Sequence, residues 1–261
     1  MDGLISRRTV VKGIAAGVPL AAILADPNLA RAVAQTLEPV SIVTEGGHKV
    51  IGALAVPTKT PAAAVLVIHE WWGLNDQIKS VAAELAANGY LGLAVDLFGG
   101  KVAVNEDEAA RLSQSVGAHP DAAIDILKSW IAWLKRDPRC DGHVATLGYC
   151  FGGGWSLNAS LAAPVNATVI YYGNVRKSAD ELRALKGPVL VHYGLHDQYV
   201  TTSMVEGFEA EARKAGKSVT VYAYDANHAF ANPTGAGFPY VKDAADRAWS
   251  RTIAFLKAND K

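Results

Sequence analysis

Short apolar runs alternate with stretches of helical periodicity along most of this chain. The run AAVLVIH at Ala63–His69 is apolar at every position before its last, which is typical of a strand buried on both faces. Strands and helices that take turns indicate a mostly parallel sheet covered by helices on both sides. Half of the 261 residues are hydrophobic and 19% are charged, as expected for a chain with a substantial core.

The pattern predicts one α/β domain over residues 35–261, without linkers or repeats. The expected strands are Pro39–Glu45, Lys49–Val56, Ala63–His69, Tyr90–Val95, His143–Leu147, Ala167–Tyr171, Val189–His192 and Ser218–Tyr222. The expected helices are Gln77–Asn88, Asn105–Val116, Pro120–Lys135, Gly152–Leu161, Ser203–Ala215 and Tyr240–Leu256. Gly46-Gly47 is a hairpin signal, so we expect the first two strands to add an antiparallel edge to the sheet.

The first 34 residues have the three parts of a secretory leader. Ser6–Lys12 (SRRTVVK) is charged, Gly13–Ala25 is apolar, and Ala32–Ala34 (AVA) is a small-residue cleavage signal before Gln35. The paired arginines resemble a twin-arginine signal. We therefore expect a cleaved leader, an interaction with the twin-arginine export machinery, and a periplasmic or secreted protein. A helical arm and a retained membrane anchor are the alternatives.

The composition excludes several classes of protein. The 25 Lys and Arg residues balance 25 Asp and Glu residues, so there is no electrostatic footprint of a nucleic-acid-binding protein. Two cysteines cannot form a disulfide scaffold, and the body of the chain has no apolar run of about 18 residues. Cys140 and Cys150 lie on either side of one expected strand, too far apart for a disulfide, so we expect Cys150 to be free.

Three reactive residues follow three of the expected strands. Sites in open α/β sheets lie beyond the carboxyl ends of the strands. Cys150 lies in GYCFGG, a strand–turn–helix pattern that presents a nucleophile between glycines, and the start of a helix favours the thiolate. His228 can accept the thiol proton, and Asp197 can orient the imidazole. A buried structural cysteine, a helix N-cap and a loop histidine are the alternatives for the three residues taken singly.

A fourth strand exit supplies backbone donors. The strand Ala63–His69 runs into Glu70-Trp71-Trp72-Gly73. In a sheet of this kind, this loop and the residue after the nucleophile provide the amides that bind a developing oxyanion. We therefore assign the backbone N–H groups of Trp71 and Phe151 to an oxyanion hole.

Together these motifs resemble the dienelactone hydrolase (carboxymethylenebutenolidase) family from about Pro39 to Leu256. The motifs are Cys150 in GYCFGG, Asp197, His228 in NHAF, and His69-Glu70-x-x-Gly73. The resemblance implies a single-domain α/β-hydrolase fold, a Cys-His-Asp triad, a small-molecule ester or lactone substrate, and a monomer that needs no cofactor. It also implies that Glu70 interacts with the resting cysteine and activates it.

The chain departs from the family where the substrate carboxylate is held. The resemblance places one arginine at the position of Gly100 and another at the position of Asn232. Neither Gly nor Asn provides the charged bidentate donor of a carboxylate clamp. We expect a more apolar substrate pocket instead, with contributions from the following side chains: Trp72, Phe98, Phe230 and Asn232. Packing within the core is the alternative for most of the aromatic side chains.

The sequence therefore predicts an ester or lactone hydrolase that acts through a thioester on Cys150. A thioesterase or acyltransferase on the same site is one alternative, and a non-catalytic binding protein with a hydrolase fold is another. His69-Glu70 does not begin an H-E-x-x-H zinc motif, because Gly73 replaces the second histidine. No metal site is expected.

Overall fold

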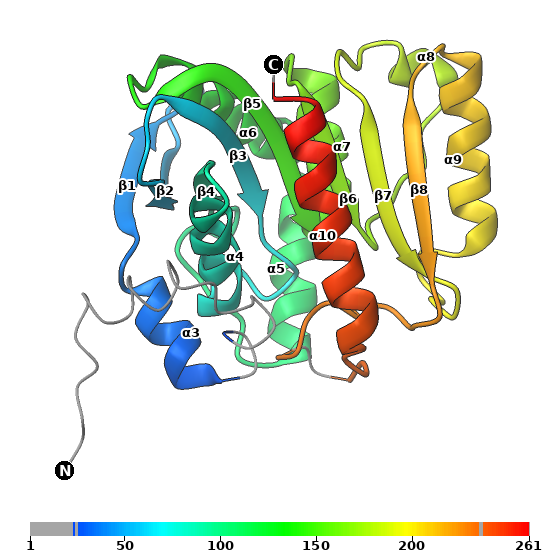
Figure 1. Ribbon diagram of the computed structural model, residues 1–261, viewed down its shortest axis with the longest axis horizontal. Coiled ribbons are helices and arrows are strands. Elements are labelled where there is room, and N and C mark those ends of the chain that lie inside the picture. Colours follow the sequence, from blue (N-terminus) through cyan, green and yellow to red (C-terminus); the bar gives the residue numbers. More distant parts are fainter. Residues whose placement is uncertain (1–22, 24–25, 235–236, 261) are drawn as a thin grey trace.

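The fold is that of a computed structural model, which describes residue 23 and residues 26–234 and 237–260 (Figure 1). The charged start of the expected leader, with Arg7 and Arg8, lies outside these residues. So does its apolar run, apart from Ile23.

Within the described residues, eight strands form one sheet in the order β1-β2-β4-β3-β5-β6-β7-β8. The strands are β1 Glu38–Val43, β2 Lys49–Ala55, β3 Ala62–Ile68, β4 Leu91–Val95, β5 Cys140–Tyr149, β6 Ala167–Tyr171, β7 Val189–Gly194 and β8 Val219–Tyr224. β1 and β2 form an antiparallel hairpin, and β2 is antiparallel to β4. All other neighbours are parallel. The predicted parallel sheet with an antiparallel N-terminal hairpin is confirmed.

Helices cover both faces of this sheet. They are α3 Pro27–Ala34, α4 Asp76–Ala87, α5 Glu106–Ala118, α6 Pro120–Arg136, α7 Phe151–Ala162, α8 Ala179–Leu182, α9 Thr202–Lys214 and α10 Lys242–Ala258. Side chains alternate along β3: Val65 and Val67 join a core with α3, α4 and α10, whereas Leu66 and Ile68 join a core with α5, α6 and α7. Figure 1 shows α10 crossing one face of the sheet.

The predicted helices and strands are all present, with bounds that differ from the predicted ones by at most three residues. Local sequence signals explain their starts: the side chains of Asn75, Asn105 and Thr201 accept hydrogen bonds from the first turns of α4, α5 and α9. Two helices were not predicted. α8 has four residues and a Ser178/Glu181 capping box, which is too short for a periodic pattern.

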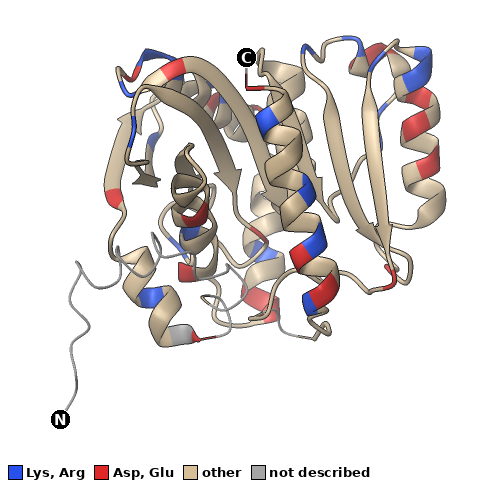
Figure 2. Ribbon diagram, viewed as in Figure 1, with Lys and Arg blue, Asp and Glu red and all other residues tan. Residues whose placement is uncertain are grey.

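Because β3 to β8 run parallel to one another, their carboxyl ends lie at the same edge of the sheet. In Figure 1 the arrowheads of β3, β7 and β8 point toward the same edge. Charged residues of both signs lie mainly on helices, loops and strand ends, and they are interspersed (Figure 2). None of the helices in the described part of the chain is both long and apolar enough to cross a membrane.

The second unpredicted helix, α3, occupies the end of the expected leader. Asp26 caps it, and the side chain of Val33 is fully buried. The Ser80 hydroxyl of α4, which donates to the carbonyl of Asp76 at 2.8 Å, also lies 3.3 Å from the carbonyl oxygen of Ala30. Arg31 lies 3.9 Å from Asp76. The expected cleavage signal thus lies inside a helix that packs against the domain.

We expect a protein that begins at Gln35 to be less stable than one that begins at Asp26. Burial of a side chain such as Val33 contributes about 1.5–3 kcal/mol, and each kcal/mol lost lowers Tm by about 2–4 °C in a domain of this size. Thermal unfolding of both proteins measures the difference. Arg31→Ala in the longer protein is the control and should change little, because its ion pair is exposed. Equal midpoints for the two lengths would show that α3 adds nothing.

Candidate active site

Cys150 lies at the sharp turn between β5 and α7. Its backbone has φ 53° and ψ −116°, a conformation that a non-glycine residue rarely adopts. A Cβ on Gly148 would lie 2.0 Å from the carbonyl oxygen of Gly152, and a Cβ on Gly152 would lie 2.3 Å from that of Ile68. The two glycines are therefore required by the close approach of backbone to backbone, which lifts the thiol above the sheet edge.

The three residues predicted from the strand exits lie together. His228 Nε2 is 3.1 Å from Cys150 Sγ, and His228 Nδ1 is 2.7 Å from Asp197 Oδ2. Because an ionised carboxylate only accepts hydrogen bonds, Nδ1 carries a proton and donates it to Asp197. Cys150 is half-buried, whereas His228 and Asp197 are buried. The arrangement suits proton transfer between sulfur and imidazole.

The surroundings of His228 favour its charged form. Burial lowers the pKa of His228, but the hydrogen bonds to Asp197 and Cys150 and the charges of both partners outweigh it and raise the pKa to about 10. The Asp197 carboxylate is itself held in place, since its Oδ1 accepts from the backbone N–H groups of Tyr199 and Val200 at 2.8 and 2.9 Å. An imidazolium beside the sulfur would stabilise a thiolate.

Glu70 is buried close to this group but is held by two uncharged donors. The Tyr172 hydroxyl donates to Glu70 Oε1 at 3.1 Å, and the Asn232 amide donates to Oε2. Burial raises the pKa of Glu70, although both hydrogen bonds and the charge of His228 act in the opposite direction. Among the described residues, no hydrogen bond joins Glu70 to Cys150, whose sulfur instead faces His228.

Trp71 and Phe151 present unused backbone donors. Both residues are half-buried, and neither N–H donates a hydrogen bond to any acceptor within the part of the chain that is described. Phe151 is the first residue of α7, where an N–H group has no partner inside the helix. Two free amides at adjoining strand exits are what an oxyanion hole requires.

The residues expected to line the substrate pocket have different surroundings. Trp72 is half-buried and packs edge-on against Trp71 at 5.2 Å. Phe98 is 6% exposed and contacts Phe151. Phe230 has no exposed surface and packs against aromatic side chains in the core, so it is not open to a substrate.

The two positions matched to family arginines offer no cation. Asn232 is 1% exposed. Its amide oxygen accepts hydrogen bonds from the backbone N–H and the hydroxyl of Thr234, and its amide nitrogen donates to Glu70. It is a partner of Glu70 rather than an open pocket wall. Gly100 has no side chain, and its N–H donates to Asp96, which holds the loop.

Three aromatic residues at the site were not predicted from the sequence. The rings of Tyr172, Tyr199 and Phe238 lie 5.2, 5.2 and 5.4 Å from the imidazole of His228. All three rings meet the imidazole at a steep angle, in edge-type contacts. Tyr172 directly follows β6, so the strand-exit criterion would have found it. Phe238 comes from a loop with no such signal.

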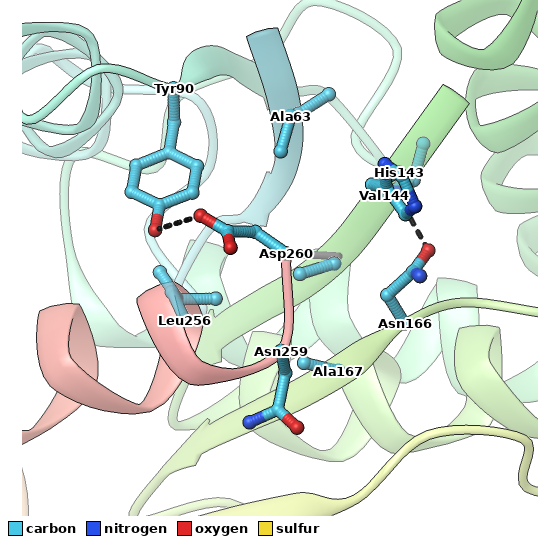
Figure 3. Close-up of a pocket in the computed structure, with 11 residues that line it drawn as sticks. Ala63, Tyr90, His143, Val144, Asn166, Ala167, Leu256, Asn259 and Asp260 are labelled. Carbon is cyan, nitrogen blue, oxygen red and sulfur yellow. Dashed lines mark hydrogen bonds between the residues drawn. The ribbon is translucent and has the colours of Figure 1, made fainter. Parts of the chain in front are cut away.

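Three other features of the described residues bear on the chemistry of the site. Both cysteines are free. No group of three or more His, Cys, Asp or Glu side chains among the described residues is arranged to hold a metal ion. A shallow pocket near Tyr90, Asn166 and Asp260 lies at the amino ends of β3 and β5 (Figure 3), at the opposite edge of the sheet from Cys150.

Comparison with known proteins identifies relatives over most of the chain. The sequence profile of the dienelactone hydrolase family matches residues 50–259. A carboxymethylenebutenolidase of Pseudomonas sp. (strain P51) is 28% identical over 84% of this chain and 94% of its own length. Protein usf of Aquifex pyrophilus is 30% identical over 82% of this chain and 95% of its own.

Solved structures share the fold. A dienelactone hydrolase-like promiscuous phosphotriesterase from metagenomic libraries matches with a TM-score of 0.78 and 24% identity, covering 86% of this chain and 99% of that one. A putative dienelactone hydrolase from Klebsiella pneumoniae matches with a TM-score of 0.74 and 23% identity, covering 85% and 98%. The predicted α/β-hydrolase fold is thus confirmed.

We expect the stability of the wild type relative to Glu70→Gln to fall as the pH rises. Because burial raises the pKa of Glu70, the folded protein keeps this proton to a higher pH than the unfolded chain does. The stabilisation from this retained proton is complete below the pKa of a glutamate in the unfolded chain, about 4.3, and is lost as the pH rises through the pKa of Glu70 in the folded protein. Each unit of difference between these two pKa values corresponds to about 1.4 kcal/mol of stability. Urea unfolding of both proteins between pH 4.5 and 8 measures this slope.

A matched control for this slope is Glu206→Gln, which alters an exposed carboxylate on α9. It should leave the pH profile of the wild type unchanged. A difference between wild type and Glu70→Gln that stays constant or grows with pH would mean that Glu70 is not kept protonated by its surroundings.

Proposed function

The chain belongs to the dienelactone hydrolase family, and from this premise we propose that it hydrolyses carboxylic esters or lactones through a thioester on Cys150. The observation that supports the mechanism best is the hydrogen-bonded row from Asp197 through His228 to the sulfur of Cys150. Its position at a strand–helix turn, beside two free amides, supports the same chemistry.

In the proposed reaction, the Cys150 thiolate attacks the carbonyl carbon and a carbon–sulfur bond forms. The electron pair of the carbonyl moves to its oxygen, where the N–H groups of Trp71 and Phe151 stabilise the negative charge. The bond to the leaving oxygen then breaks, and the His228 imidazolium donates its proton to that oxygen. A thioester remains. Water attacks this thioester, gives a proton to His228, and releases the acid and the thiolate.

We propose that the substrate is uncharged near the reacting carbonyl. The surroundings supply an aromatic rim instead of a cationic clamp, since Tyr199 and Phe238 lie against His228. Gly100 carries no side chain, and the uncharged amide of Asn232 is buried and hydrogen-bonded to Glu70 and Thr234. A buried carboxylate of the substrate would have no charged partner from these two positions, which is unfavourable.

We also propose that the protein is exported and works as a monomer. Arg7 and Arg8 in Ser6–Lys12 support export by the twin-arginine route. The row of Cys150, His228 and Asp197 is complete within a single chain, so the proposed chemistry needs no residue from a second copy. Replacing both arginines by lysine in the full chain should keep the protein out of the periplasmic fraction of a bacterial host. The intact mass of the exported wild type would locate the cleavage relative to Ala34. Equal export of both proteins would refute the proposed route.

We expect Cys150→Ala to abolish hydrolysis of p-nitrophenyl butyrate, with a fall in kcat of about 10³-fold or more. The wild type should prefer this ester to p-nitrophenyl hemisuccinate, which carries a carboxylate on an acyl chain of the same length. The rate of p-nitrophenolate release measures both comparisons.

The control is Cys140→Ala, at the far end of β5, which should keep full activity. Equal turnover in Cys150→Ala and wild type would overturn the assignment of Cys150 as the nucleophile. If both proteins bind p-nitrophenyl butyrate equally well and neither hydrolyses it, the result would favour a binding protein.

A further inference from the structure

His69 lies between two strand exits, and the proposed reaction does not use it. Its side chain is fully buried. The backbone N–H of Leu97 donates to His69 Nε2 at 3.1 Å, so this nitrogen carries a lone pair rather than a proton. His69 Nδ1 therefore carries the proton and donates it to the carbonyl oxygen of Glu70 at 2.5 Å. Burial lowers the pKa of His69, which favours the neutral ring.

The hydrogen bond from His69 acts on one particular peptide group. The carbonyl of Glu70 and the N–H of Trp71 belong to the same trans peptide, whose two polar groups point in opposite directions. A donor that fixes the carbonyl therefore also fixes the direction of the Trp71 N–H. The N–H of Gly73 donates to the same carbonyl at 3.3 Å, a longer contact. His69 thus provides the shorter of the two hydrogen bonds that orient this peptide.

The same residue contacts the second arm of the site. The imidazole of His69 is stacked with the ring of Phe151 at 5.8 Å, with an angle of 13° between the planes. A Cβ on Gly152 would lie 2.4 Å from the carbonyl oxygen of His69, so the start of α7 rests on this backbone. His69 therefore touches both segments that carry the two free amides.

We propose that His69 is a positioning residue that orients the Trp71 N–H toward the oxyanion through its Nδ1 hydrogen bond to Glu70. This inference rests on the proposed function, because it assigns a task within that reaction. The two ring nitrogens have separate tasks: Nδ1 orients the oxyanion amide, and Nε2 anchors the loop that begins at Leu97. A merely structural histidine would make no such separation.

Two variants separate the two nitrogens. In His69→Asn, the short amide can donate from near the position of Nδ1, but Leu97 loses its acceptor. In His69→Gln, the longer amide can accept from Leu97, but the Glu70 carbonyl loses its nearest donor and keeps that of Gly73. A buried donor without an acceptor is more costly than a carbonyl that retains one of two partners.

The experiment compares both variants with a parent that carries Cys140→Ala, so that Cys150 is the single thiol of the chain. Single-turnover acylation by p-nitrophenyl butyrate reports on the oxyanion hole. Alkylation of Cys150 by iodoacetamide reports on the thiolate alone, because attack at a saturated carbon forms no oxyanion. Thermal unfolding reports on the structural role.

We expect His69→Gln to acylate about 10–100-fold more slowly than the parent, approaching the loss of one oxyanion donor. His69→Asn should acylate within about threefold of the parent, yet it should unfold at a lower temperature than His69→Gln because Leu97 has no acceptor. The alkylation rate should be the same in all three proteins. Activity and stability then fall in different variants.

Three results would overturn the inference. They are acylation of His69→Gln at the parent rate, an equal loss in His69→Asn, or a fall in alkylation that parallels the fall in acylation. Each of these leaves acylation of the parent intact, so the proposed function survives it. A parent that does not acylate at all would instead overturn the proposed function and this inference together.

Discussion

The close contact between the start of α7 and the end of β3 is the constraint on which the site depends. Gly148 and Gly152 let the backbone after β5 turn back against the carbonyl of Ile68 at a distance that no side chain allows. This contact places Cys150 above the sheet edge and brings the N–H of Phe151 near the loop that carries Trp71. A larger residue at either glycine would separate the nucleophile from its oxyanion donors.

The site concentrates conformations and charges that are unfavourable by themselves. Cys150, Tyr172 and Ala229 are the non-glycine residues with positive φ in the described chain, and all three belong to strand exits around the thiol. His228 and Glu70 are buried ionisable groups in the same place. A sheet with two well-packed faces supplies the stability that keeps these groups in position.

The uncharged partners of Glu70 distinguish this site from one built around arginine. Tyr172 and Asn232 satisfy both carboxylate oxygens without adding positive charge. Burial of Glu70 outweighs these hydrogen bonds and the charge of His228, and the pKa of its carboxyl rises. The side chains packed around His228 are aromatic rather than cationic. This agrees with the proposed substrate, which is neutral near its carbonyl.

The sequence by itself determined the order of strands and helices, the parallel sheet, and the strand exits that carry Cys150, Asp197 and His228. These features follow from periodicity and from turn chemistry, which act over a few residues. The sequence did not reveal α3 as part of the packed fold, because its apolar residues also suit the end of a leader. Nor did it reveal that Asn232 holds Glu70.

Only the tertiary structure decided such contacts, since they join residues far apart in the chain. Asn232 and Glu70 are 162 positions apart, and Leu97 meets His69 across 28 positions. Phe238 reaches His228 from a loop with no local signal. Which side chains meet there depends on how the loops pack at the sheet edge, and local sequence patterns carry no information about that packing.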